Sequence, residues 1–188
     1  MSTDDLPEHV RRNRGIWDLW AADYVAAAEE GWRDDVPSWG LWSVPEASLG
    51  LLDDVADRDV IELGCGTAYV SAWLARRGAR PVGIDNSAAQ LATARRLQQE
   101  HGLAFPLVHG NAEAVPYPDG SFDLAISEYG ACLWADPDRW IPEAARLLRP
   151  GGRLVFLTNS WLAALCVPDG VDSVIADRLV RPAFGMHR

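Results

Sequence analysis

The chain has 188 residues, and 48% of them are hydrophobic, so it is long enough to bury one sizeable core. Its formal net charge of −10 argues against a broad surface for nucleic acid or anionic membrane, because those partners select basic faces. The cysteines, Cys65, Cys132 and Cys166, have neither Cys-x-x-Cys nor zinc-site spacing. Residues 1–8 are polar rather than signal-like, and no apolar run could span a bilayer. We therefore expect reduced thiols and a cytoplasmic protein without a metal site.

The N-terminal region is rich in tryptophan. Apolar residues recur at three- and four-residue spacing over residues 15–30, which predicts a helix that Gly31 and Pro37 close. A second short helix is expected over residues 45–55, with Pro45 suited to a first helical position. Between them, residues 39–42 (WGLW) are expected to form a loop. We predict a tryptophan-rich helical cap over residues 1–56, which holds Trp17, Trp20, Trp32, Trp39 and Trp42.

From Asp59 onward, short buried runs alternate with helical patterns. The predicted strands are residues 60–63, 81–84, 105–109, 122–127 and 153–157. The predicted helices are residues 69–77, a helix that Asn86 or Ser87 caps and that continues to Glu100, and residues 137–148. Strands separated by helices predict an α/β fold with a doubly wound, mainly parallel sheet over residues 57–188. One further helix is expected at about residues 172–179.

Residues 59–67 (DVIELGCGT) have the pattern of a buried strand that turns through two glycines into a helix. Gly83-Ile84-Asp85 follows one helix and one strand later, so the pair predicts a nucleotide-like ligand with a carboxylate for its ribose. A dinucleotide loop would need glycine or alanine where bulky Tyr69 stands, and the Gly-Lys-Ser/Thr of a P-loop is absent. Glu62 also favours a ligand with a positive centre. The loop thus suits a nucleoside without phosphates, with a dinucleotide oxidoreductase as the weaker alternative.

Residues 62–67 (ELGCGT) resemble the first motif of class I S-adenosylmethionine-dependent methyltransferases, in the methyltransferase type 11 or ubiquinone/menaquinone-biosynthesis-like group. Gly83-Ile84-Asp85 is similar to the family's second, acidic motif. Residues 110–123 are similar to its third block, and residues 147–152 to its lead-in to strand five. These four motifs cover about residues 59–157. The resemblance implies a Rossmann-like fold, S-adenosylmethionine as cofactor, S-adenosylhomocysteine as product and methyl transfer to a small-molecule acceptor.

The expected cofactor-binding residues come from the motifs and from the aromatic N-terminal region. They are Glu62, Gly64, Cys65, Gly66, Asp85, Asn86, Asn111, Ala112, Glu113, Ser127, Tyr24 and Trp42. Asp85 would accept both ribose hydroxyls, and Asn86 would sit beside the adenine. Asn111 stands where the family commonly has Asp, so its amide oxygen would accept from the adenine amino group. Glu128, Tyr129 and Tyr24 are the candidates for a general base, which only a nucleophile that must lose a proton requires.

The absence of one motif narrows the class of methyl acceptor. Residues 128–130 (EYG) end the fourth predicted strand, where methyltransferases acting on DNA amino groups place Asn-Pro-Pro-Tyr. With the acidic charge, this favours a small, partly apolar acceptor and no nucleic acid. The N-terminal tryptophans could cover such a molecule as a lid, although Trp17 and Trp20 also fit the core of an amphipathic helix.

Family members usually continue past strand five with a helix and a hairpin that completes a seven-stranded sheet. Residues 160–188 do not provide two further strands, so we expect a truncated member whose fifth strand is an exposed edge. Such an edge invites pairing, and a homodimer could form there. The same truncation motivates an alternative function: a catalytically impaired S-adenosylmethionine-binding or interaction protein.

Overall fold

The computed structural model describes residues 6–168 and 175–182. The chain divides into two units, residues 1–157 and residues 158–188, and each is described by itself. The first unit contains both the predicted N-terminal cap and the predicted sheet. A domain boundary after residue 56 stays a prediction.

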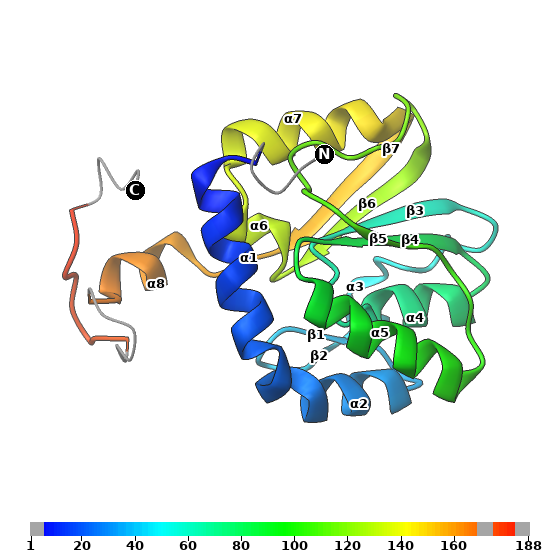
Figure 1. Cartoon of the computed structure of the whole chain (residues 1–188), viewed down its shortest axis with the longest axis horizontal. Coiled ribbons are helices and arrows are strands. Elements are labelled where there is room, and N and C mark those ends of the chain that lie inside the picture. The colour runs from blue at the N-terminus through cyan, green and yellow to red at the C-terminus, as the bar shows by residue number, and fades with distance from the viewer. Residues whose placement is uncertain (1–5, 169–174, 183–188) are drawn as a thin grey trace. The chain divides into compact units, whose positions relative to one another are not determined.

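A five-stranded parallel sheet forms the centre of the first unit. Its strands are β3 (Asp59–Leu63), β4 (Arg80–Asp85), β5 (Leu107–His109), β6 (Phe122–Glu128) and β7 (Leu148–Leu157). They lie in the order β5-β4-β3-β6-β7, and every neighbouring pair is parallel (Figure 1). The chain thus places β4 and β5 on one side of β3, and then β6 and β7 on the other side. This reversal opens a crevice at the carboxyl ends of the strands, and the predicted α/β, doubly wound fold class is confirmed.

Helices cover both faces of this sheet. On one face, α7 (Pro137–Leu147) packs Trp140 and Leu147 against Ile61 and Leu63 of β3. On the other, α4 (Tyr69–Arg76) packs Val70 against Val60 and Leu124. The alternation of a strand's side chains between its two faces explains why β3 contributes to both clusters.

Local capping signals mark where the helices beside the sheet begin and end, in agreement with the sequence prediction. The helix α5 (Ala88–His101) begins where the Ser87 hydroxyl accepts a hydrogen bond from the Gln90 backbone N–H, and it ends at Gly102 in the left-handed conformation. Asp136 caps α7, and Pro137 occupies its first turn. A short helix, α6 (Ala131–Trp134), follows β6 directly.

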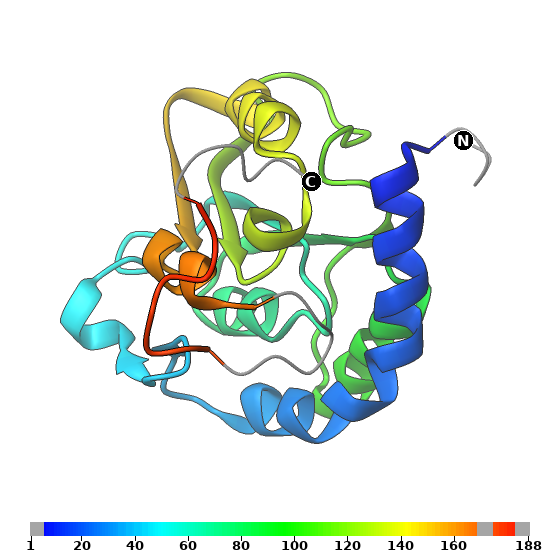
Figure 2. The same ribbon diagram turned by 90° about the vertical axis from the view of Figure 1, so that its left-hand side faces the viewer.

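The N-terminal helix is longer than its apolar pattern predicts. Helix α1 (Glu8–Trp20) begins seven residues before the predicted start at Gly15, a 3-10 turn follows (η2, Ala21–Tyr24), and α2 (Val25–Arg33) ends three residues past Glu30. Figure 2 shows the chain turning sharply between α1 and α2. Val10 is the only described residue of α1 that is buried, so its first turns carry no apolar period to detect.

Only one turn of the predicted second helix forms, and a hairpin precedes it. Strands β1 (Ser38–Trp39) and β2 (Val44–Pro45) pair antiparallel, and α3 (Glu46–Leu49) follows. The prediction of a helix to residue 55 is wrong, because Gly50 adopts the left-handed conformation and ends α3. The buried carboxylate of Glu46 accepts hydrogen bonds from the Trp39 indole and the Leu52 backbone N–H, which holds the hairpin and the turn together.

The second unit contains α8 (Trp161–Cys166), which begins where the Ser160 hydroxyl accepts from the Leu162 backbone N–H. The helix predicted at residues 172–179 is wrong for residues 175–179, which are not helical, and residues 172–174 lie outside the described part of the chain. Residues 158–168 and 175–182 form no strand, and the truncation stays a prediction. Within the described ranges, no helix is long and apolar enough to cross a membrane.

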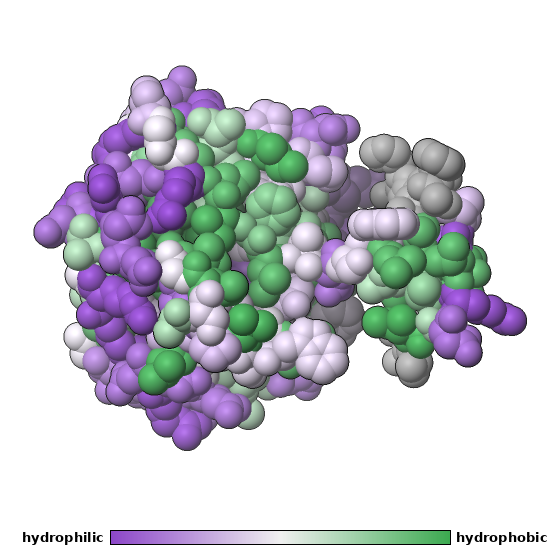
Figure 3. Space-filling model, turned by 180° about the vertical axis from the view of Figure 1, so that it is seen from behind, coloured by the Kyte–Doolittle hydropathy of each residue, from purple (hydrophilic) through white to green (hydrophobic). Residues whose placement is uncertain are grey.

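Some large hydrophobic side chains remain exposed in the first unit, among them Leu41, Trp42 and Phe156. Figure 3 shows one face of the chain on which hydrophobic side chains gather between hydrophilic borders. Gathered apolar side chains of this kind can mark a binding surface.

Candidate functional site

A cavity of about 580 Å³ is lined by residues of the first unit, including the glycine loop after β3 and the residues that end β4 and β6. Its volume lies in the range of sites for drug-sized ligands. The lining contains ten of the twelve predicted cofactor-binding residues: Tyr24, Glu62, Gly64, Cys65, Gly66, Asp85, Asn86, Asn111, Ala112 and Glu113. The predicted crevice and the predicted residues therefore coincide.

Glycine is required where the loop after β3 meets the segment after β6. Gly64 has φ +73°, and a Cβ atom there would lie 2.4 Å from the Ala131 backbone nitrogen. A Cβ on Gly130 would lie 2.1 Å from the Gly64 carbonyl oxygen. Two backbones thus touch with no room for side chains, and this contact shapes the floor of the cavity.

Asp85 holds the glycine loop in place at the end of β4. Its Oδ2 atom accepts from the Gly66 backbone N–H at 2.7 Å, and Oδ1 accepts from the Ser87 backbone N–H at 2.7 Å. Burial raises the pKa of Asp85, while these two N–H groups oppose the rise. The carboxylate lines the cavity, so the same group that orders the loop can meet a ligand.

Glu62 is a buried carboxyl group beneath the loop. Its Oε2 atom accepts from the Ser71 backbone N–H at 2.9 Å and from the Ser71 hydroxyl at 2.5 Å. Burial raises the pKa of Glu62 to about 8 despite these donors. The group is therefore mostly protonated at neutral pH, and an incoming cation would favour its ionised form.

The end of the cavity beside β5 contains an unpartnered acceptor. Asn111 Oδ1 accepts from the Glu113 backbone N–H at 3.0 Å. Glu113 Oε1 bonds His9 Nε2 at 2.7 Å and accepts from the Asp136 backbone N–H at 3.0 Å, whereas the buried Glu113 Oε2 has no partner in the described structure. A buried acceptor without a donor calls for one from a ligand. The sequence predicts that the amide oxygen of Asn111 accepts a hydrogen bond from the adenine amino group. In the structure, the open acceptor at this end is Glu113 Oε2.

Helix α1 supplies polar contacts that the apolar pattern does not predict. Arg14 Nε donates to Asn86 Oδ1 at 2.9 Å, and Asn86 Nδ2 donates to the Val10 carbonyl at 2.8 Å. Asp18 accepts from the Ser87 hydroxyl at 2.6 Å. Arg14 and Asp18 are four residues apart, so their side chains lie on one face of the α1 helix. That spacing is the signal that could have revealed the contact.

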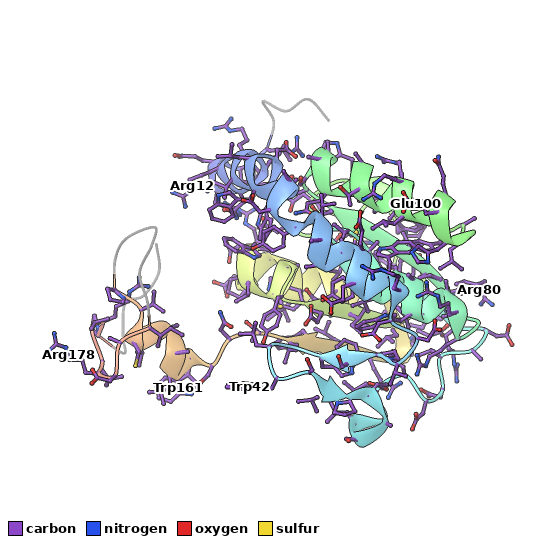
Figure 4. The ribbon with its side chains drawn as sticks, turned by 90° about the horizontal axis from the view of Figure 1, so that it is seen from below. Arg12, Trp42, Arg80, Glu100, Trp161 and Arg178 are labelled. Atoms are coloured by element: carbon purple, nitrogen blue, oxygen red, sulfur yellow. The ribbon has the colours of Figure 1, made fainter. Side chains whose placement is uncertain are left out.

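Two predicted cofactor-binding residues do not line the cavity. Ser127 is fully buried, and its hydroxyl donates to the Leu63 carbonyl at 2.7 Å and accepts from the Cys132 backbone N–H. Trp42 is 89% exposed and lies at the outer edge of the loop between β1 and β2 (Figure 4). Ser127 thus ties the end of β3 to the segment after β6 from within the core, and Trp42 does not lie at the cavity.

The predicted bases Glu128, Tyr129 and Tyr24 all line the cavity. The Tyr69 hydroxyl donates to Glu128 Oε2, and the Gly40 backbone N–H donates to Glu128 Oε1 at 3.3 Å. Burial raises the pKa of Glu128, and both donors oppose the rise. The sequence does not predict the Tyr69 contact, because the two residues are 59 positions apart.

Residues 61–156, just over half of the chain, match the family model described as a methyltransferase domain. The chain belongs to this methyltransferase family. The demethylmenaquinone methyltransferase of Thermus thermophilus is 38% identical over 112 residues, which are 58% of this chain and 51% of that relative. The chain therefore spans about half the length of that curated relative.

Solved structures agree with the methyltransferase fold. An S-adenosylmethionine-dependent methyltransferase from Mesorhizobium loti is 28% identical with a TM-score of 0.55, and the match covers 63% of this chain and 55% of that one. The [4+2]-cyclase SpnF is 27% identical with a TM-score of 0.62, and the match covers 79% and 60%. A shared fold does not by itself decide the reaction.

S-adenosylmethionine is the cofactor of this methyltransferase domain, and the cavity fits it. Asp85 suits ribose hydroxyls, and the open Glu113 Oε2 suits an amino group such as that of adenine. Among the described lining residues there is no lysine, arginine or histidine, so no cation opposes the positive sulfonium. The predicted cofactor is therefore confirmed, while the individual binding roles of the residues stay predictions.

Proposed function

We propose that the chain transfers a methyl group from S-adenosylmethionine to a small-molecule acceptor. The observation that carries the proposal is that one cavity joins two different ends. The cofactor end consists of the glycine loop, Asp85 and Glu113. The acceptor end consists of Glu128 and Tyr69 with the β1–β2 hairpin and α2.

The cofactor supplies a methyl group on a positively charged sulfur. At the cofactor end, Asp85 would hold the ribose and Glu113 Oε2 the adenine amino group, while Gly64 lets the methionine part approach the backbone. Glu62 lies beneath the same loop, where its carboxyl group can respond to the positive charge.

At the acceptor end, the residues position a nucleophile and can take its proton. Glu128 would accept that proton, with Tyr69 and Gly40 holding its two oxygens. The rings of Trp17 and Trp134, 5.1 Å apart, line the cavity and help to exclude water. Methyl transfer depends strongly on this arrangement, because holding the two reactants in line removes a large part of the entropic barrier.

A small acceptor is supported by the size of the cavity and by the name of the Thermus relative, whose acceptor is demethylmenaquinone. A second candidate function is cofactor binding without methyl transfer. The likeness to SpnF favours it, because that protein is a [4+2]-cyclase. The two candidates differ in turnover, not in cofactor binding.

Two measurements test these proposals. Calorimetry with S-adenosylmethionine, S-adenosylhomocysteine and NAD should show binding of the first two only, and binding of NAD alone would overturn the proposal. A screen for S-adenosylhomocysteine formation over a set of small acceptors then separates the two candidates. Product formed only in the presence of an acceptor supports the methyltransferase, whereas tight binding without product supports the second candidate.

We also propose a cytoplasmic location and a homodimer through the edge strand β7. Among the described strands, β7 pairs only with β6, which leaves its other edge open to a second copy. Sedimentation equilibrium at several protein concentrations tests the dimer, and a constant monomer mass would contradict it.

A further inference from the structure

We propose that the methyl acceptor carries a basic, positively charged nitrogen, and that the carboxylates of the acceptor end select it against anionic acceptors. The inference rests on the proposed function and names the substrate class of the same site. It follows from the charges, the placement and the aromatic surroundings of the residues that line the cavity.

The lining is strongly acidic. Six of its described residues are carboxylic acids, and none is lysine, arginine or histidine: the acids are Glu30, Asp34, Glu62, Asp85, Glu113 and Glu128. The cofactor carries one net positive charge, from its sulfonium and amino groups against one carboxylate. Even with Glu62 protonated at neutral pH, the remaining acids outnumber that charge. A carboxylate or phosphate on the acceptor would find no positively charged side chain among the described lining residues.

Three of the six acids belong to the wall away from the cofactor end. Glu30 and Asp34 flank the end of α2, where Gly31 packs so closely on Tyr69 that a Cβ there would lie 3.1 Å from the ring. Tyr69 in turn donates to Glu128. The contacts from α2 through Tyr69 to Glu128 make one continuous wall, which does not include Asp85 at the end of β4 or Glu113 in the segment after β5.

Aromatic rings complete the surroundings that a cation needs. The Trp17 ring lies 5.1 Å from the Tyr24 ring and 5.1 Å from the Trp134 ring, and all three residues line the cavity. Ring faces attract a cation, and carboxylates pair with it. An ammonium group can therefore satisfy both kinds of neighbour, whereas a hydroxyl group gains only hydrogen bonds.

The reaction balances for such an acceptor. A bound ammonium group first gives one proton to the Glu128 carboxylate, which frees the nitrogen lone pair. That lone pair forms the new carbon–nitrogen bond, and the electron pair of the broken carbon–sulfur bond stays on sulfur. Glu128 later returns its proton to solvent, so no oxidant or further reactant is needed.

The test measures binding of three probes with one skeleton to the protein saturated with S-adenosylhomocysteine. The probes are 2-phenylethylamine, 2-phenylethanol and phenylacetate, and calorimetry reports their affinities. We expect the amine to bind roughly tenfold more tightly than the alcohol, and phenylacetate more weakly than either. Equal affinities, a preference for phenylacetate, or no binding of any probe would overturn the inference. Failure of S-adenosylhomocysteine itself to bind would instead contradict the proposed function.

Matched variants test which carboxylates cause the preference for the amine over the alcohol. Glu30→Gln combined with Asp34→Asn, and separately Glu128→Gln, should each reduce the preference for the amine over the alcohol by about threefold to tenfold. Glu29→Gln is the control, because Glu29 is the neighbour of Glu30 on α2 but pairs with Arg96 instead of lining the cavity. An unchanged amine preference in both acceptor-end variants, with S-adenosylhomocysteine still bound, would contradict the role of these carboxylates.

Discussion

The two ends of the cavity are built in different ways. The cofactor end is made by three loops that follow β3, β4 and β5, and the contacts within its two motifs are short in sequence, because Asp85 accepts from Gly66 and Ser87, which are 19 and 2 positions away. The acceptor end joins Glu128 to Tyr69 and Gly40, which are 59 and 88 positions away. A site made by local turns can be read from a motif, whereas a site made by distant side chains depends on the whole fold.

The largest expected effect is at the backbone contact that forms the floor of the cofactor end. Gly64→Ala should destabilise the protein by about 2–5 kcal/mol, because the left-handed φ is strained with a Cβ and that Cβ would collide with Ala131. Urea unfolding measures the loss, and calorimetry with S-adenosylhomocysteine should show no binding. Unimpaired binding would mean that the loop can move away from the segment after β6.

Gly151→Ala is the matched control for this substitution. Gly151 also has a left-handed φ, +82°, but a Cβ there would meet nothing within 4 Å. Backbone strain alone should cost about 1 kcal/mol and leave cofactor binding intact. Equal losses in the two variants would show that strain, and not the close approach at Gly64, explains the effect.

The second prediction separates the two ends directly. Asp85→Ala should weaken S-adenosylhomocysteine binding by about 1.5–3 kcal/mol, because charged hydrogen bonds to the ribose are lost. Glu128→Ala should leave that affinity within about 0.5 kcal/mol, because the proposal assigns Glu128 to the acceptor and not to the cofactor. Calorimetry on both variants provides the comparison, and a large loss of cofactor affinity in Glu128→Ala would merge the two ends into one site.

The sequence predicts the sheet well because each strand is a short buried apolar run that ends in a turn signal. All five predicted strands are present, and the helices after β3 and β4 begin and end within one or two residues of the prediction. The motifs at Gly64 and Asp85 are contiguous, so their places at the ends of β3 and β4 follow from the strand positions alone.

The remaining features arise from contacts between residues far apart in the chain. The start of α1 escapes prediction because Val10 is its only buried residue and its other contacts are polar, such as that of Arg14 with Asn86, which is 72 positions away. The hairpin at residues 38–45 has no two-residue turn of the Asn-Gly type, and Ser43 takes a left-handed φ of 47°. Tertiary contacts hold both elements, and no local pattern encodes them.

A third prediction concerns Glu62, which lies beneath the loop between the two ends. Its pKa of about 8 in the folded protein exceeds its ordinary value of 4.5. Between these values the folded state binds more protons than the unfolded state, so stability falls as the pH rises from about 4.5 to about 8. Glu62→Gln cannot titrate and should remove a slope of up to about 1.4 kcal/mol per pH unit.

Urea unfolding at pH 5.5, 6.5 and 7.5 measures that slope. Glu100→Gln, on the exposed side of α5, serves as the control and should keep the wild-type slope. Calorimetry in buffers of different ionisation enthalpy adds a second readout, because a positive cofactor should release a proton from Glu62 and should not do so from the glutamine variant. An identical pH slope in Glu62→Gln and wild type would contradict a protonated Glu62.

The smallest expected effect is at the acceptor end. Tyr69→Phe removes the hydroxyl that donates to Glu128, and that hydrogen bond lowers the pKa of Glu128. The pKa should therefore rise further, and the acidic limb of the pH profile of kcat/KM should move to higher pH if ionised Glu128 takes the proton. Affinity for S-adenosylhomocysteine should stay unchanged, as should both quantities in Tyr117→Phe, whose ring packs on Phe122 and does not line the cavity. If Tyr69→Phe weakened cofactor binding and left the pH profile in place, Tyr69 would belong to the cofactor end, and the boundary between the ends would lie at Glu128 instead.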